Sequence, residues 1–229
     1  LELSSFFERE NGHLQIDSMN ASWMILAEGF HQGIVRDTIK RLFDLLVSAA
    51  MLVVTLPIMA LAALLIKLES SGPVLYRQER VGQGGNNFTI LKFRSMCVDA
   101  EKDGKPRWAG QNDSRVTLTG RFIRRTRIDE LPQVFNVFFG DMSFVGPRPE
   151  RPYFVQDLTQ KIPYYGVRHT VKPGITGWAQ VRYAYGATDE DAMHKLQYDL
   201  YYVKNHSLFL DLMILFQTAQ VVLWGKGVR

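Results

Sequence analysis

The chain has 229 residues, and a composition of 46% hydrophobic and 22% charged residues excludes intrinsic disorder. Its 27 basic and 23 acidic residues leave a formal net charge of +4, too small by itself to indicate nucleic-acid binding. A mean hydropathy of −0.09 argues against a polytopic membrane protein, and a single cysteine excludes an internal disulfide framework. The chain begins with Leu1 rather than Met, so we expect it to be part of a longer protein.

The first two segments differ sharply in polarity. Residues 1–35 mix charged, polar and glycine residues, and we interpret them as an N-terminal linker or a partner-dependent segment. Residues 36–70 contain a run of 22 residues without a charge, from Leu45 to Ile66. As a helix this run would extend about 33 Å, enough to cross a hydrocarbon core of ~30 Å. The segment is therefore a candidate membrane helix, with a buried core helix as the alternative.

The middle of this run contains Pro57, which removes a backbone hydrogen bond and clashes with the preceding helical turn. Basic residues flank both ends, so a full span would place one basic cluster on the side that the positive-inside rule disfavours. A helix bent at Pro57 would instead enter one leaflet and return. The sequence therefore favours a re-entrant membrane helix.

Residues 71–229 combine strand and helix signals, which predicts an α+β fold with a small mixed catalytic domain. Residues 74–95 alternate around Gly82 and the Gly84-Gly85 pair, a pattern typical of a β-hairpin. Helical signals extend over residues 118–139, with an interruption at 127–132 and a stop at Gly140. The final segment, Leu208 to Trp224, has a strong apolar face and fits an amphipathic helix at the membrane interface.

A cluster of arginines precedes an acidic pair. Five arginines fall within thirteen residues that contain no acidic residue: Arg115, Arg121, Arg124, Arg125 and Arg127. The guanidinium fork binds phosphate oxygens in a bidentate manner, so the cluster is a candidate phosphate site. A solvated basic helix face against anionic lipid is the alternative.

The acidic pair Asp129-Glu130 has two interpretations. Asp129 could cap a helix, with Pro132 in the first helical turn. It could also be a nucleophile, because a carboxylate at a helix N-terminus beside arginines has its charged form favoured. An ionised carboxylate is what attack on phosphorus requires.

A second acidic group, Asp189-Glu190-Asp191, has the form of the Asp-x-Asp metal motif of conventional glycosyltransferases. The same letters are typical of an acidic helix start before Met193 and Leu196. Both interpretations remain open at this stage.

Several ordered motifs between about Lys40 and Arg229 resemble one family. They are Lys40-Arg41-Leu42-Phe43-Asp44, the mid-helix Pro57, Gly72-Pro73-Val74, Lys92-Phe93-Arg94-Ser95-Met96, Asp129-Glu130-Leu131-Pro132-Gln133, Gly140-Asp141-Met142-Ser143-Phe144-Val145-Gly146-Pro147-Arg148-Pro149 and Pro173-Gly174-Ile175-Thr176-Gly177-Trp178. The chain thus resembles the bacterial sugar transferases that are monotopic polyprenyl-phosphate phosphoglycosyl transferases. Residues 1–35 are similar to the linker of longer, exopolysaccharide-type members, whose preceding membrane domain would be missing here.

The resemblance implies a magnesium-dependent reaction in two steps. Asp129 would attack the β-phosphorus of a UDP-sugar and expel UMP, and undecaprenyl phosphate would then take the sugar phosphate from the enzyme. Glu130 would assist catalysis or share the Mg²⁺ ion with Asp129. Four cationic residues besides Arg124 are matched or plausible phosphate contacts: Arg148, Lys92, Arg94 and Arg168.

One position departs from the family pattern, because Leu56 stands where some members place a serine before the bend proline, and Thr55 comes one residue earlier. The resemblance also implies an enzyme on the cytoplasmic face of the bacterial inner membrane, acting early in exopolysaccharide or surface-glycan synthesis. A homodimer is expected from longer members, and no nucleic-acid partner is expected. The alternatives are a conventional metal-dependent glycosyltransferase that releases UDP, and a non-enzymatic membrane-anchored interaction module.

Overall fold

A computed structural model describes residues 11–14, 16, 33–97, 100, 113–183, 186 and 188–224. The helices are α3 (Ile34–Glu69), α4 (Leu118–Arg125), α5 (Gln133–Phe139), α6 (Pro152–Lys161), α7 (Trp178–Arg182), α8 (Asp189–Asn205) and α9 (Leu208–Trp224). The strands are β1 (Leu75–Val81), β2 (Asn87–Phe93), β3 (Ser143–Val145) and β4 (Gly174–Thr176). Helices and small sheets are mixed along the chain, so the prediction of an α+β fold is confirmed at this level.

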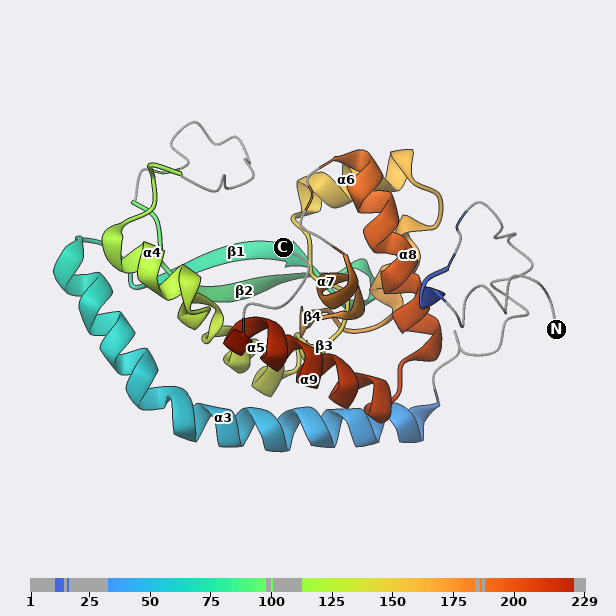
Figure 1. The fold of residues 1–229 in the computed structure, drawn as a ribbon, viewed down its shortest axis with the longest axis horizontal. Coiled ribbons are helices and arrows are strands. Elements are labelled where there is room, and N and C mark those ends of the chain that lie inside the picture. The colour runs from blue at the N-terminus through green and yellow to red at the C-terminus, as the bar shows by residue number, and fades with distance from the viewer. Residues whose placement is uncertain are drawn as a thin grey trace.

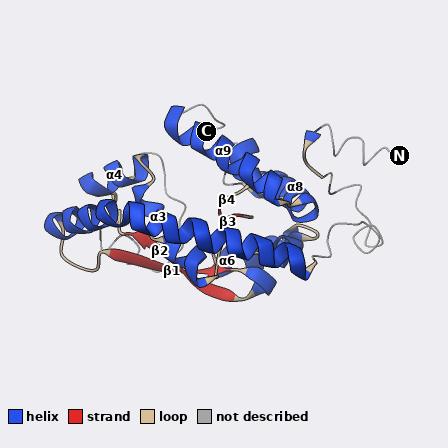
Figure 2. Ribbon diagram, turned by 90° about the horizontal axis from the view of Figure 1, so that it is seen from below, coloured by secondary structure: helices blue, strands red, loops and turns tan. Residues whose placement is uncertain are grey.

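The long helix α3 forms the base of the molecule (Figure 1). Its ribbon runs straight for part of its length and then turns toward α4. Seen from below, α3 lies across the molecule, with the β1–β2 hairpin on one side and α9 on the other (Figure 2). Among the described residues it is the one helix long and apolar enough to cross a membrane, and 22% of its most apolar window is buried.

The start of α3 is bound to the rest of the domain by three charged side chains. Lys40 pairs with Asp211 of α9 and donates to the Val145 carbonyl oxygen at 3.2 Å. Arg41 donates to the last carbonyl oxygens of α5, and the carboxylate of Asp44 accepts from Ser143 Oγ at 3.1 Å. Each charged residue of the motif Lys40–Asp44 therefore has a specific partner in the domain.

The end of α3 is bound to the same domain. The carboxylate of Glu69 accepts from the backbone of Leu118 at 2.7 Å and Thr119 at 3.1 Å, and thereby satisfies two free amides at the start of α4. Arg94 donates to the carbonyl oxygens of Ser70 and Ser71 at 2.9 and 2.7 Å. Both ends of α3 are thus held by one globular body.

The predicted hairpin is confirmed, because β1 and β2 pair antiparallel from Leu75 opposite Phe93 to Val81 opposite Asn87. The turn between them uses Gly84 and Gly85 at φ of 67° and 80°, values that favour glycine. The predicted helix break is also confirmed, since a 3-10 turn, η3 (Ile128–Glu130), separates α4 from α5. Gly140 ends α5 at φ 98°.

Two loops meet at the parallel pair β3–β4. A Cβ atom built on Gly174 would lie 2.1 Å from the backbone nitrogen of Gly146, and one on Gly177 would lie 2.2 Å from the Gly146 carbonyl oxygen. Only glycine permits this approach, which explains why both segments carry glycine at these positions. The contact fixes the loop that follows β3.

Replacement of Gly174 by alanine is therefore expected to destabilise the fold by about 2 kcal/mol, because the methyl group would overlap backbone atoms. Gly166→Ala is the matched control, since a Cβ atom there meets nothing within 4 Å. Thermal unfolding of both variants checks the expectation, and equal melting temperatures would contradict it.

Candidate active site

The acidic pair lies in the 3-10 turn η3, which directly follows Arg127, a residue with an unusual backbone conformation. Arg127 has φ 60°, a left-handed conformation that costs free energy in a non-glycine residue. Hydrogen bonds from Glu130 N to the Arg127 carbonyl oxygen and from Leu131 N to that of Ile128 close the turn. The acidic pair is thus presented by a short, internally bonded turn and not by a regular helix.

The expectation that Asp129 caps a helix is wrong. The cap residue of α5 is Pro132, which has no side-chain donor or acceptor, and Leu131 and Pro132 already have helical dihedral angles. Because these two residues extend the helical path, Asp129 lies one turn too early to reach the free amides of α5. Its Oδ1 atom is instead buried without a hydrogen-bond partner.

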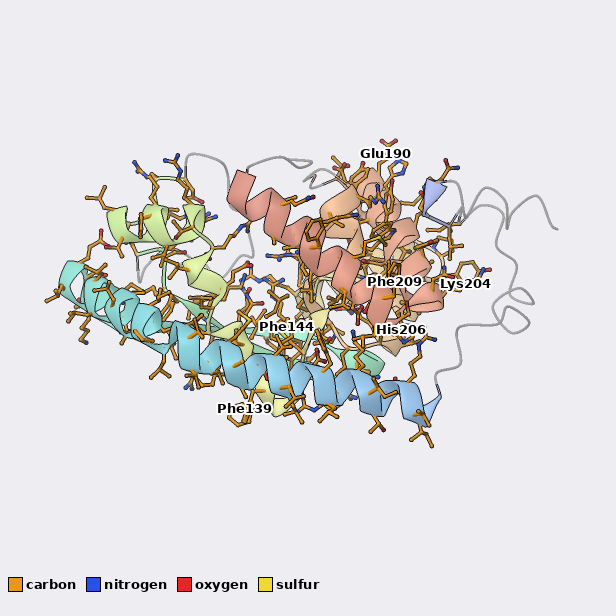
Figure 3. The ribbon with its side chains drawn as sticks, turned by 60° about the horizontal axis from the view of Figure 1, so that its bottom comes forward. Phe139, Phe144, Glu190, Lys204, His206 and Phe209 are labelled. Carbon is orange, nitrogen blue, oxygen red and sulfur yellow. The ribbon has the colours of Figure 1, made fainter. Side chains whose placement is uncertain are left out.

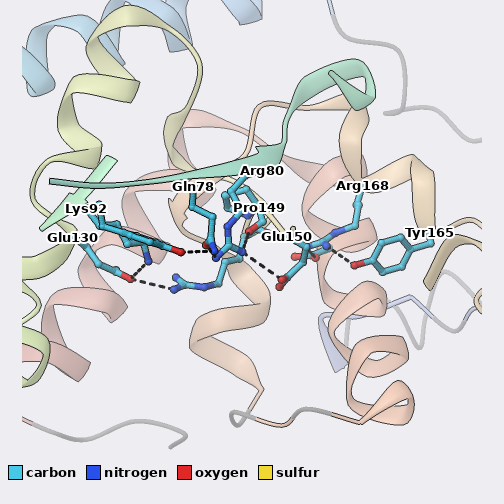
Figure 4. Close-up of polar contacts among 11 residues, drawn as sticks. Gln78, Arg80, Lys92, Glu130, Pro149, Glu150, Tyr165 and Arg168 are labelled. Carbon is cyan, nitrogen blue, oxygen red and sulfur yellow. Dashed lines mark hydrogen bonds and ion pairs between the residues drawn. The ribbon is translucent and has the colours of Figure 1, made fainter. Parts of the chain in front are cut away.

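Glu130 is the electrostatic centre of the site (Figure 4). Its Oε1 atom accepts from Lys92 Nζ of β2 at 3.0 Å and from Arg148 Nη2 at 3.1 Å. Burial would raise the pKa of Glu130, but Arg148, Lys92 and Arg127 outweigh it and hold that pKa well below its usual value. Glu130 is therefore ionised and paired at neutral pH.

Asp129 shows the opposite shift. Burial and the adjacent charge of Glu130 raise its pKa from 3.8 to about 6, although Lys92, Arg127 and Arg124 act in the other direction. The sequence-based expectation that arginines favour its charged form is wrong in net direction, because burial and the charge of Glu130 outweigh the effect of the cations on the pKa. The carboxyl still ionises near neutral pH, in the range suited to a nucleophile.

Hydrogen bonds from other parts of the domain hold the backbone of the Arg148 loop, residues 146–151. Arg168 Nη2 donates to the Arg148 carbonyl oxygen at 2.9 Å, and Arg80 Nη1 donates to the Pro149 carbonyl oxygen at 2.9 Å (Figure 4). The Gly146 and Val81 amides complete the support by hydrogen bonds to Thr176 O and Glu150 O, respectively. The backbone of this loop is therefore held in place by two arginine side chains and two backbone hydrogen bonds.

The structure brings together four of the predicted site residues and separates two others from them. Asp129, Glu130, Lys92 and Arg148 form one cluster, with Arg124 close enough to affect the Asp129 pKa. Arg168 lies behind the cluster in an ion pair with Asp199 at 2.7 Å. Arg94 is occupied at the end of α3 through Ser70 and Ser71.

Sequence reasoning missed three residues that shape the site. Arg80 and Asp199 support the Arg148 loop, yet no local pattern distinguishes them from the other charges of their strand and helix. Gln133, which is 2% exposed, has a buried Nε2 atom without a hydrogen-bond partner. Its place four residues after Asp129 was the available clue, because such spacing puts side chains on neighbouring turns.

The second acidic group is explained by helix capping. Asp191 Oδ2 accepts from the Thr188 backbone at 3.0 Å, and Thr188 Oγ1 accepts from Asp191 N, which forms a capping box at the start of α8. Asp189 pairs with Lys161 at 3.0 Å. These contacts favour the acidic helix start over a metal motif.

The described residues include no group of three or more His, Cys, Asp or Glu side chains arranged to hold a metal ion. Asp129 and Glu130 fit a Mg²⁺ ion as a pair of hard carboxylate donors, since the buried Oδ1 atom of Asp129 has no hydrogen-bond partner and could accept a cation. Magnesium sites commonly combine one or two carboxylates with phosphate oxygens and water. The donor set is therefore compatible with Mg²⁺ brought together with a phosphorylated substrate.

Comparison of the sequence with protein families decides which family the chain belongs to. The sequence model that describes the bacterial sugar transferase family matches residues 35–225. The chain belongs to this family. The chain is 50% identical over 191 residues to UDP-N-acetylgalactosamine-undecaprenyl-phosphate N-acetylgalactosaminephosphotransferase of Aeromonas hydrophila, covering 83% of this chain and 45% of the relative.

Two further relatives support the assignment. A UDP-glucose:undecaprenyl-phosphate glucose-1-phosphate transferase of Klebsiella pneumoniae is 46% identical, over 79% of this chain and 39% of the relative. Exopolysaccharide production protein PSS of Rhizobium leguminosarum is 41% identical, over 82% of this chain and 98% of the relative. The chain thus spans less than half of the first two relatives and nearly all of the third.

The shifted pKa predicts that Asp129 destabilises the metal-free fold at neutral pH. Its pKa is about 6 in the folded chain against 3.8 in the reference state, so ionisation costs free energy on folding. We expect Asp129→Asn to stabilise the fold at pH 7.5 by on the order of 2 kcal/mol, or roughly 5 °C.

Thermal unfolding in chelator checks this expectation. The gain should shrink as the pH falls from 7.5 toward 4, because the carboxyl is then protonated in the folded chain. Asp157→Asn, at an exposed carboxylate of α6, is the matched control. A gain that is equal for both variants, or independent of pH, would contradict the assigned pKa.

Proposed function

We propose that the protein transfers a sugar 1-phosphate from a UDP-sugar to undecaprenyl phosphate. The observation that carries the proposal is the contrast within the acidic pair: Glu130 is paired with two cations, whereas Asp129 has a buried oxygen without a partner and a pKa of about 6. Neighbouring carboxylates with opposite pKa shifts are typical of divided catalytic roles. The names of the relatives supply the donor and acceptor classes.

The first step uses Asp129 as the nucleophile. One carboxylate oxygen forms a bond to the β-phosphorus of the UDP-sugar while the bond from that phosphorus to UMP breaks, and UMP leaves with the electron pair. Arg148, Lys92 and Arg124 provide positive charge for the phosphate oxygens. The Arg148 loop needs no reorganisation, because its backbone is already held by Arg168 and Arg80.

In the second step an oxygen of undecaprenyl phosphate attacks the same phosphorus. The bond to Asp129 breaks, the electron pair returns to the carboxylate, and a diphosphate-linked lipid sugar is released. A Mg²⁺ ion held by Asp129 and Glu130 would neutralise phosphate charge in both steps. It would also offset the repulsion between the two carboxylates that raises the Asp129 pKa.

The acceptor lipid requires a membrane, and the geometry of α3 supports a re-entrant helix bent at Pro57. Its two ends are bound by the same domain, through Lys40 and Arg41 at the start and Glu69 at the end. A helix held in this way cannot place its ends on opposite faces of a bilayer if that domain stays on one face. The side chains between them present an apolar surface, with Val53 78% exposed.

The bend has a local cause in the chain. Pro57 has no amide for the Val53 carbonyl oxygen, so one helical hydrogen bond is missing. The hydroxyl of Thr55 donates to the Met51 carbonyl oxygen at 2.7 Å, a contact that tends to bend helices. Thr55 thus bonds one turn before the proline gap and does not supply the partner that a serine at position 56 would offer.

We assign residues 1–35 to a linker, 36–70 to the re-entrant helix and 71–229 to the catalytic domain on the cytoplasmic face of the inner membrane. Phe139 and Phe209, which are 72% and 78% exposed, extend the apolar surface outside α3 (Figure 3). In longer relatives this part of the chain would act within a larger protein, as a monomer or a homodimer. The reaction would begin the synthesis of an exopolysaccharide or surface glycan.

The covalent step predicts a phosphosugar adduct on Asp129 when the protein is incubated with Mg²⁺ and UDP-sugar alone. Mass spectrometry of the peptide that contains Asp129 should detect the adduct, with UMP released in equal amount. UDP-glucose and UDP-N-acetylgalactosamine are the donors to test first, because the relatives use both. Release of UDP in place of UMP would support a conventional glycosyltransferase.

Asp129→Asn should lower turnover by a factor on the order of 10³ or more, because the amide cannot act as the nucleophile. Asp157→Asn, the exposed control, should retain full turnover. An Asp129→Asn variant with normal activity would eliminate the covalent mechanism. A protein that binds anionic lipid but turns over no UDP-sugar would instead be an interaction module.

Removal of Mg²⁺ with EDTA should abolish UMP release, and added Mg²⁺ should restore it. The physical reason is that two adjacent carboxylates and a diphosphate group repel each other without a cation between them. Undiminished UMP release in EDTA would show that Lys92, Arg124 and Arg148 suffice to neutralise the phosphates.

A further inference from the structure

The described residues before α3 include a docked segment, 11–14 and 16, which we call the clasp. Trp178 Nε1 of α7 donates to the Gly12 carbonyl oxygen at 2.7 Å, and Leu14 N donates to the Gln197 carbonyl oxygen of α8 at 3.2 Å. Leu14 and Ile16 are only 3% and 4% exposed. The clasp lies outside residues 35–225, so the match to the family says nothing about it.

One end of the clasp reaches the Arg148 loop through Trp178. Trp178 directly follows Gly177, whose backbone is packed so closely on Gly146 that a Cβ atom would lie 2.2 Å from the Gly146 carbonyl oxygen. Gly12 has φ 65°, and a Cβ atom there would lie 3.3 Å from the Trp178 ring. The clasp backbone, the indole ring and the start of the Arg148 loop therefore form a continuous packed series.

The other end reaches the same loop through a buried arginine. Leu14 and Ile16 belong to an apolar cluster that contains Tyr165. The hydroxyl of Tyr165 accepts from Arg168 Nη1 at 2.8 Å, and Arg168 Nη2 donates to the Arg148 carbonyl oxygen at 2.9 Å. Displacement of the clasp would remove two buried side chains from the apolar cluster that holds Tyr165, the partner of Arg168.

We propose that the clasp is an intramolecular positioning element for the Arg148 loop, packed against α6, α7, α8 and the turn Tyr165–Thr170. Because two separate series of contacts converge on one loop, undocking the clasp loosens the loop while Asp129 and Glu130 stay in place. Sequence changes in the clasp, or partners that bind it, would therefore alter the position of the Arg148 loop.

Hydrogen exchange on the full chain in detergent tests the clasp without reference to catalysis. In the variant Leu14→Ser/Ile16→Ser, the peptide spanning residues 144–151 and the Val81 amide should exchange about tenfold faster, since their bonds depend on the loop position. The control Ile34→Ser/Val35→Ser changes the same kinds of side chain at positions 85% and 73% exposed, and should leave this exchange unchanged. Equal exchange in the clasp variant and wild type would overturn the proposal.

Trp178→Phe provides a milder second variant in case the serine pair unfolds the domain. It removes the hydrogen bond to Gly12 and keeps an aromatic ring in the core, so faster exchange over residues 144–151 is again expected. Exchange that rises evenly through β1, β2 and α9 would indicate general destabilisation and contradict a specific link to the loop.

The effect on turnover rests on the proposed function and is measured separately by a double-mutant cycle. The clasp variant should lower kcat/KM about tenfold alone but add little when Arg168 is already replaced by lysine, because both act through the same loop. Fully additive losses would contradict the coupling. If the wild-type protein releases no UMP but the clasp variant still shows the faster exchange, the proposed function is refuted and the proposal for the clasp stands.

Discussion

One buried carboxylate, that of Glu130, joins three segments that are distant in sequence. Its Oε1 atom accepts from Lys92 on β2 and from Arg148 on the loop after β3, while its own backbone belongs to η3. Because a buried charge that is left without a partner is strongly destabilising, the two ion pairs of Glu130 favour the meeting of these three segments. Asn136 adds a further contact between these segments. Its side chain accepts a hydrogen bond from Leu91 N and donates one to the Thr89 carbonyl oxygen, which docks α5 along the edge of β2.

The same pairing explains how two adjacent acidic residues acquire different properties. Glu130 gains two cation contacts, whereas burial and like-charge repulsion dominate at Asp129 and raise its pKa to about 6. In the proposed function, the substrate phosphates and their cation would offset the cost of ionising Asp129. The left-handed backbone of Arg127 adds a second local cost two residues earlier in the chain.

The long helix α3 is attached to the domain at both ends. The contacts of Lys40, Arg41 and Asp44 secure its start against β3, α5 and α9, and Glu69 secures its end against α4. Most of the apolar middle is left uncovered by the domain, because only 22% of it is buried. In the proposed function, this arrangement holds the acidic pair at a constant height above the membrane surface, where a soluble nucleotide sugar and a lipid phosphate can both reach it.

The sequence by itself determined the local features: the β1–β2 hairpin, the break between α4 and α5, the stop at Gly140, the long apolar helix and the acidic pair as the candidate centre. These follow from periodicity, turn residues and capping, which act over a few residues. Only the tertiary structure decided that Asp129 caps nothing, that its pKa is raised, that Arg94 and Arg168 hold backbone, and that residues 11–14 and 16 are docked. Long-range ion pairs and burial set these properties, and both depend on which distant segments meet when the chain folds.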